Sequence, residues 1–210
     1  MNAASVFAVA LLLAVSGAAP VSAAPASDAA LAQEESFHAE IARTGQWNGH
    51  MIRGPWDIDD KILGQPEPSA CHRDLSSVTA PLFDLTPDIH DRFERVNRVT
   101  GHPAGETDYI MALTWFPELA WLADRAQAGD HATIAQIPGL QALPEAARIA
   151  ATARAAALAP LADLAPGIYL KPGLGPHTLA HTLHHERCHW LTKWVHGEGA
   201  PRGLDGKILP

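Results

Sequence analysis

Long apolar segments are missing from this sequence, and its first 24 residues contain no charged side chain. The longest apolar run, residues 6–15, has about ten residues, which is too short to cross a bilayer. Small residues follow this run, and Val21-Ser22-Ala23 supplies the pattern that a signal peptidase reads before its cleavage site. The sequence therefore predicts a signal peptide over residues 1–23. The mature chain is expected to be secreted or periplasmic, with no membrane contact after cleavage.

A basic surface is also lacking. The chain has 15 Lys and Arg against 23 Asp and Glu, a formal net charge of −8, and its basic residues are scattered. Such a chain offers no positive stripe to a phosphate backbone, which argues against nucleic acid as a partner. The glycine-rich motifs of NTPases and dinucleotide enzymes and the serine motif of hydrolases are absent as well.

Cysteine is scarce, since the chain contains only Cys71 and Cys188. In an oxidising compartment two cysteines most often form one disulfide. We therefore expect a Cys71–Cys188 disulfide that closes a long loop. Two free thiols, one of them next to a metal ligand, are the alternative.

The residues after the predicted cleavage site fit one domain, because about 187 of the 210 residues are enough for a single hydrophobic core. We place this domain at residues 24–197 and a flexible tail at residues 198–210. A short strand is predicted at 168–171. The predicted fold class is mainly α, or α+β with a short strand element before the last helix. Helical periodicity and terminal Pro or Gly predict helices at about 28–44, 87–100, 107–128 (kinked at Pro117, or two abutting helices that meet there), 145–158 and 176–196.

The last predicted helix is rich in histidine and contains the pattern His-Glu-x-x-His at His185, Glu186 and His189. Four residues along a helix bring two imidazoles onto one face, about 6 Å apart, close enough to bind one Zn²⁺. The glutamate lies beside the open coordination site of such a metal, where it can take a proton from zinc-bound water. The spacing therefore predicts His185 and His189 as metal ligands and Glu186 as a general base.

Residues 168–191 resemble the zincin metallopeptidases. Thr182 and Leu183 before the first histidine, and Trp190 and Leu191 after the second, match the residue types that this family has at those positions. The resemblance implies a single compact zincin-like helical domain with Zn²⁺ as cofactor and a peptide or protein as substrate. The expected function is that of an exported zinc-dependent metallohydrolase, a peptidase that uses zinc-bound water and a glutamate base.

Two features of the motif depart from the family pattern. Arg187 stands where the family has an uncharged residue, and the third zinc ligand is missing from its usual places. His72, His196 and Glu198 are the candidates for this ligand, and a disulfide at the neighbouring cysteine would bring His72 beside the motif.

Two other functions remain open from the sequence. The histidines between residues 177 and 189 form a stripe along one helix, which a non-catalytic protein can use to bind Zn or Cu. Alternatively, the chain is a helical interaction module in which the histidines have no function of their own.

Overall fold

The computed structural model describes residues 28–47, 49–58, 67–100 and 111–193. The predicted signal peptide at 1–23 and tail at 198–210, together with His196 and Glu198, lie outside the described residues. None of the helices in the described ranges is long and apolar enough to cross a membrane. This part of the chain is mainly helical with small sheets, as the sequence predicts.

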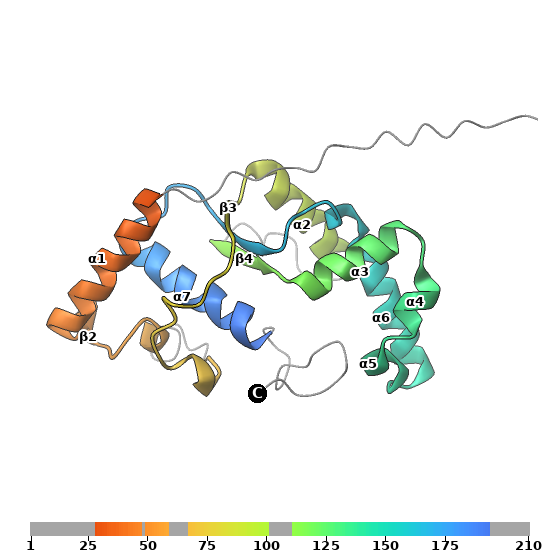
Figure 1. Cartoon of the computed structure of the whole chain (residues 1–210), viewed down its shortest axis with the longest axis horizontal. Coiled ribbons are helices and arrows are strands. Elements are labelled where there is room, and N and C mark those ends of the chain that lie inside the picture. Colours follow the sequence, from red (N-terminus) through yellow and green to blue (C-terminus); the bar gives the residue numbers. More distant parts are fainter. Residues whose placement is uncertain (1–27, 48, 59–66, 101–110, 194–210) are drawn as a thin grey trace, which may run out of the picture.

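A three-stranded sheet lies between the helices (Figure 1). Its middle strand is β5 (Gly167–Leu170), which pairs in parallel with β3 (Leu82–Asp84) and in antiparallel fashion with β4 (Ala112–Trp115). β5 is buried along its whole length, as expected for a strand covered on both faces. The strand predicted at 168–171 is thus confirmed, one residue earlier than expected.

The two faces of β5 pack against different helices. Ile168 and Leu170 contact two leucines of α7 (Pro176–Thr192), the helix that carries the motif. Successive side chains of a strand alternate between the faces of its sheet, so Tyr169 points the other way. The motif helix therefore covers one face of the sheet, and a second hydrophobic core covers the other.

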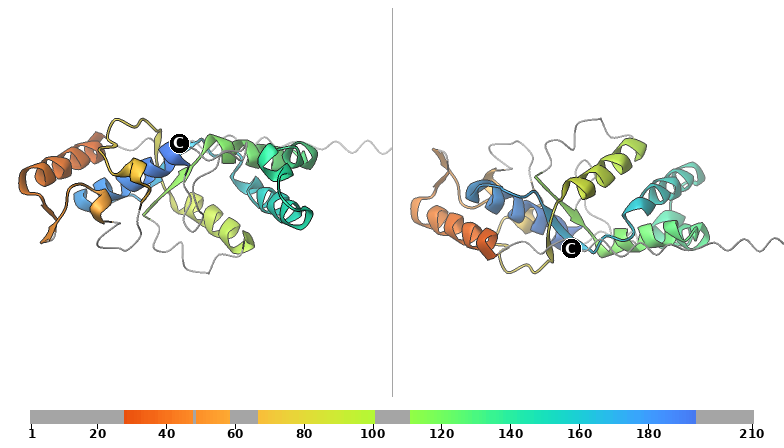
Figure 2. Two further views of the ribbon diagram at one scale, coloured as in Figure 1. Left: turned by 90° about the horizontal axis from the view of Figure 1, so that it is seen from below. Right: turned by 90° about the horizontal axis from the view of Figure 1, so that it is seen from above.

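The second core is formed by α2 (Pro87–Thr100) and α3 (Pro117–Gln127) around Tyr169. Ile89 of α2 and Trp115 of β4 are almost fully buried in it. The views in Figure 2 show these helices on the opposite side of the sheet from α7. The prediction of a helix over 87–100 is confirmed.

Helix α1 (Asp28–Thr44) packs along α7 on the side of the molecule that carries the motif (Figures 1 and 2). Phe37 and Ile41 of α1 form a buried cluster with Ala180 of α7. Gly45 ends α1 in a left-handed conformation with φ of 63°, which glycine adopts without steric cost. The first predicted helix is therefore confirmed, including its end at Thr44.

The helix predicted over 107–128 is wrong in its first half. Residues 107–110 lie outside the described ranges, and residues 112–115 form β4. Phe116 is extended, with φ of −78° and ψ of 150°, and α3 begins at Pro117. A residue before proline avoids the helical region, and proline is well suited to the first position of a helix, so the chain changes from strand to helix here instead of kinking.

The motif helix is shorter than predicted. It ends at Thr192, and Lys193 follows in a left-handed conformation with φ of 57°. The Lys193 N–H bonds the carbonyl oxygen of His189, which satisfies one of the last free carbonyls of the helix. The expected straight continuation to residue 196 is therefore interrupted at Lys193.

The other predicted helix is confirmed as α6 (Glu145–Ala157), which packs against α3. The remaining elements of the described ranges are all short: β1 (Gln46–Trp47), β2 (His50–Met51), η2 (Ser69–Cys71), α4 (His131–Ala135), α5 (Pro138–Gln141) and η4 (Ala159–Leu161).

Candidate metal centre

The two histidines of the motif converge on one point. His185 and His189 are four residues apart on α7, and their Nε2 atoms are 3.0 Å from each other. Their rings stand nearly perpendicular, with centroids 4.6 Å apart. His189 is buried and His185 is partly buried. The structure thus brings together two nitrogen donors that the spacing places on one helix face.

A carboxylate holds the other nitrogen of the first histidine. Oε1 of Glu67 lies 3.1 Å from Nδ1 of His185, and Glu67 is buried. A carboxylate accepts hydrogen bonds only, so Nδ1 of His185 carries the proton and Nε2 presents its lone pair. In metal sites, a carboxylate bound in this way to the outer nitrogen of a histidine orients the ring and makes its metal-binding nitrogen more basic.

Glu67 also contacts His184, which the structure buries completely. Oε2 of Glu67 is 3.3 Å from Nε2 of His184, and the same nitrogen lies 3.1 Å from the backbone carbonyl of Cys71. Burial alone would raise the pKa of Glu67, but the hydrogen bonds from His184 and His185 outweigh it and hold this pKa below its ordinary value. Glu67 is therefore a charged, oriented acceptor between two imidazoles.

The glutamate of the motif faces the sheet. Its backbone position on α7 lies three residues after Leu183, which packs on β5, and Glu186 is 6% exposed. Thr114 stands opposite Ile168 in the sheet and shares its face, which is the face that α7 covers. The Thr114 hydroxyl donates a hydrogen bond of 2.6 Å to Oε2 of Glu186. The edge strand β4 thus fixes the position of the Glu186 carboxylate.

The charged residue at the third motif position points away from the histidines. Arg187 forms an ion pair with Glu34 of α1, and both side chains are more than nine-tenths buried. His38, one turn further along α1, lies 3.6 Å from the same glutamate. Arg187 therefore connects α7 to α1, which accounts for a charged residue at this buried position of the helix.

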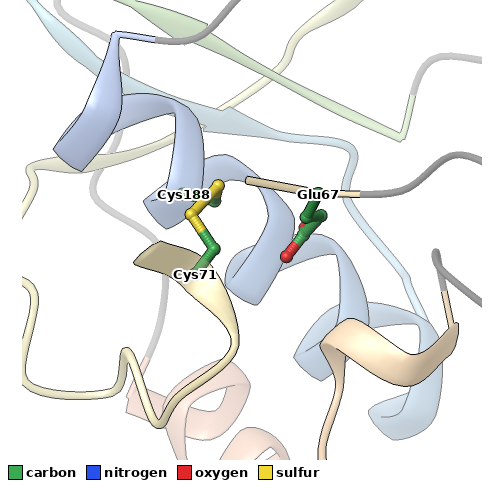
Figure 3. Close-up of side chains that lie close together, drawn as sticks. All are labelled: Glu67, Cys71 and Cys188. Atoms are coloured by element: carbon green, nitrogen blue, oxygen red, sulfur yellow. A yellow bond between two sulfur atoms is a disulfide. The ribbon is translucent and has the colours of Figure 1, made fainter. Parts of the chain in front are cut away.

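The expected disulfide is present and crosslinks the motif helix to the segment of Glu67. Cys71 at the end of η2 bonds Cys188 of α7, with Cα atoms 5.5 Å apart, and both residues are fully buried. Figure 3 shows Glu67 on the same side of the helix as the disulfide. Because Glu67 lies four residues before Cys71, the crosslink keeps it close to His185.

A third ligand for the histidine pair is not found within the described ranges. Neither His72 nor any other described His, Cys, Asp or Glu places a ligand atom within 4.8 Å of both histidine nitrogens. The other two candidates, His196 and Glu198, lie among the residues that the structure does not describe. Within the described ranges the site therefore consists of His185 and His189, with Glu67 bound to His185 and Glu186 held by Thr114.

The sequence did not indicate Glu67 or Thr114 as parts of this site. Glu67 comes from an irregular segment, and its contact with His185 spans 118 residues. Thr114 lies in a strand where the sequence predicts a helix. The disulfide was the one available signal, since it places the residues around Cys71 beside the motif.

No protein-family model, no curated protein and no solved structure matches this chain.

Proposed function

We propose that this protein is an exported zinc-dependent metallohydrolase of zincin-like architecture that acts on peptides or proteins. The observation that carries the proposal is the convergence of the His185 and His189 nitrogens, 3.0 Å apart, while Glu67 holds the far nitrogen of His185. These two contacts hold both imidazole rings in fixed positions, unlike histidines whose rings only face solvent.

The donor set fits a zinc ion. Two nitrogens at zinc–nitrogen distances of about 2.0–2.1 Å around a tetrahedral centre lie about 3.3 Å apart. The observed 3.0 Å between the Nε2 atoms of His185 and His189 differs from this by a small side-chain rotation. Glu67 supplies the outer carboxylate that metal-binding histidines commonly have.

A zinc ion at this position would polarise a scissile carbonyl and lower the pKa of a water molecule. Glu186, one residue after the first ligand, accepts the proton of the attacking water on its carboxylate and then donates it to the leaving amine. Thr114 keeps this carboxylate in place through its 2.6 Å hydrogen bond. Glu186 directly follows the first histidine on α7, and its carboxylate is already held by β4.

A peptide substrate is favoured by the strand beside the site. β4 is the outer strand of the order β3-β5-β4, so within the described part of the chain one of its edges carries no partner strand. An extended peptide can add to such an edge through main-chain hydrogen bonds. Thr114 of this strand contacts the proposed base, which would bring an added peptide close to Glu186.

The test compares untagged mature wild type with Glu186→Gln and His185→Ala, by elemental analysis and by hydrolysis of a mixed peptide library. We expect one zinc per chain in wild type and in Glu186→Gln, hydrolysis only in wild type, and neither in His185→Ala. Glu35→Gln, the same substitution at an exposed position of α1, is the matched control and should retain both.

Three outcomes contradict the proposal. Hydrolysis that survives Glu186→Gln would exclude this glutamate as the base. More than one metal per chain with no effect of Glu186 would favour a metal-buffering protein that uses the histidine stripe. Absence of zinc even after reconstitution would leave the helical interaction module as the remaining function.

A further inference from the structure

A second group of metal-binding atoms lies next to the histidine pair. A carboxylate oxygen of Glu67 and the sulfur atoms of Cys71 and Cys188 all lie within 4.8 Å of one another (Figure 3). All three residues are buried. They come from the segment before η2, from η2 itself and from α7, so the fold and not local sequence brings them together.

We propose that reduction of the Cys71–Cys188 disulfide opens a second metal site, in which both thiolates and Glu67 bind one soft or borderline divalent ion such as Zn²⁺. Cysteine thiolates with one carboxylate or imidazole are a donor set that selects zinc over hard cations. The oxidised protein lacks this site, because a disulfide has no thiolate to offer. The site does not depend on hydrolytic activity.

The chemistry of the switch balances with a dithiol as reductant. One thiolate of the dithiol attacks a disulfide sulfur, the mixed disulfide is resolved by its second thiol, and two protein thiols and one oxidised dithiol result. Binding of the divalent ion then replaces the two thiol protons, which are released to water. The ion itself is neither oxidised nor reduced.

The surroundings of the sulfurs favour an ion once the bond is open. Cys71 and Cys188 pack with Leu75 and Val78 in an apolar cluster. Two thiolates in such apolar surroundings need a positive charge close by, because an uncompensated buried charge is costly. A metal ion supplies this compensation, and Glu67 supplies a third ligand in the same enclosed space.

A buried imidazole lies next to this group but is not part of it. Nε2 of His184 lies 3.3 Å from Oε2 of Glu67 and is completely buried. Its neighbour on the chain, His185, uses the other carboxylate oxygen. The second site is therefore a set of two thiolates and one carboxylate, with His184 as its nearest additional nitrogen.

The two sites share one carboxylate. Glu67 can ligate an ion at the thiolates through one oxygen while its other oxygen accepts the hydrogen bond from Nδ1 of His185. An ion at the thiolates would draw negative charge from this shared carboxylate, so its hydrogen bond to His185 would weaken and the zinc affinity of the histidine pair would fall. This consequence, unlike the thiolate site itself, rests on the proposed zinc pair.

The experiment titrates Co²⁺ into the full mature chain carrying His185→Ala and His189→Ala. These substitutions remove the histidine pair, so that the titration measures binding at the second site alone. The protein is reduced with a phosphine under anaerobic conditions, and the oxidised sample is titrated in parallel. We expect one equivalent of Co²⁺ and a sulfur-to-cobalt charge-transfer band in the reduced sample only. Circular dichroism recorded at each point monitors the fold.

Further variants of the same protein distinguish a site that includes Glu67 from nonspecific binding of Co²⁺ by the two thiols. Glu67→Gln should weaken Co²⁺ binding about tenfold or more while the helical signal stays, and Cys188→Ser should remove most of the band. Glu35→Gln is the matched control and should change nothing.

Three results would overturn the proposal. The first is a reduced sample without a charge-transfer band. The second is a band whose affinity is the same in Glu67→Gln, because the thiolates would then bind without the carboxylate. The third is loss of helical structure on reduction that Co²⁺ does not restore, since unfolded chains also bind metals through Cys and His. None of these results bears on whether oxidised wild type binds zinc through His185, so failure here and failure of the proposed function are distinguishable.

Discussion

The buried ion pair between Arg187 and Glu34 gives the sharpest stability prediction. Both side chains are more than nine-tenths buried and link α7 to α1. Removal of one partner by Glu34→Ala leaves a buried guanidinium without its charge partner, which costs about 3–5 kcal/mol. At about 3 °C per kcal/mol for a domain of this size, Tm should fall by about 9–15 °C.

The assay is urea unfolding of the oxidised protein followed by far-ultraviolet circular dichroism, with Glu35→Ala as the exposed control on the same helix. The double variant Glu34→Leu/Arg187→Met replaces the pair by apolar groups and should recover most of the loss, because desolvation of the two charges is then avoided. A cost below about 1 kcal/mol for Glu34→Ala would refute the reasoning, since surface pairs contribute that little. Loss of zinc in a folded double variant would instead show that Arg187 acts on the metal centre.

Three further predictions concern the site and the core. Thr114→Val should lower kcat about tenfold or more with zinc content unchanged, because a hydrogen bond to the charged Glu186 is lost. Thr114→Ser keeps the hydroxyl and should retain activity. An equal effect of both variants would argue against a role of the hydroxyl. Glu67→Gln should weaken zinc binding to the oxidised protein about 10–100-fold, because His185 loses its charged outer partner. Competition with a chromophoric chelator measures this affinity. An unchanged affinity would show that Glu67 does not support His185 as a ligand. Burial raises the pKa of Tyr169 to about 12 from 10.0, so between these pH values the unfolded chain is ionised at this residue and the folded chain is not, and stability falls as pH rises. Tyr169→Phe should abolish this part of the loss, about 2–3 kcal/mol, in unfolding curves at pH 9 and pH 12.

Most helices were predictable because their ends are chemically marked. Gly45 ends α1, Pro87 begins α2 and Pro176 begins α7, and each also has apolar residues at helical spacing. The strands β3 and β4 were missed, whereas β5 of similar length was predicted, because Pro-Gly pairs mark both ends of β5 and neither end of β3 or β4. In β4 the apolar residues also continue into α3, so the periodicity of the helix masked the strand before it.

The site was predictable only where its residues are neighbours in the sequence. His185, Glu186 and His189 follow from the spacing of a single helix. Glu67 and Thr114 reach the motif across 118 and 72 residues, and nothing in their local sequence marks them. Such contacts are fixed by the packing of α7 on the sheet and by the disulfide, which are properties of the whole fold.

The disulfide did contain part of this information. A crosslink at Cys71 restricts the nearest residues to the neighbourhood of α7, and four residues span at most about 14 Å. Within that segment the sequence favours His72, because a histidine near the motif is expected to be a direct ligand. The structure brings Glu67 to the motif instead, against the nitrogen of His185 that faces away from His189. The crosslinked segment therefore acts on the histidine pair by orienting His185, the proposed ligand, and for this reason we expect reduction of the crosslink to change the proposed metal binding.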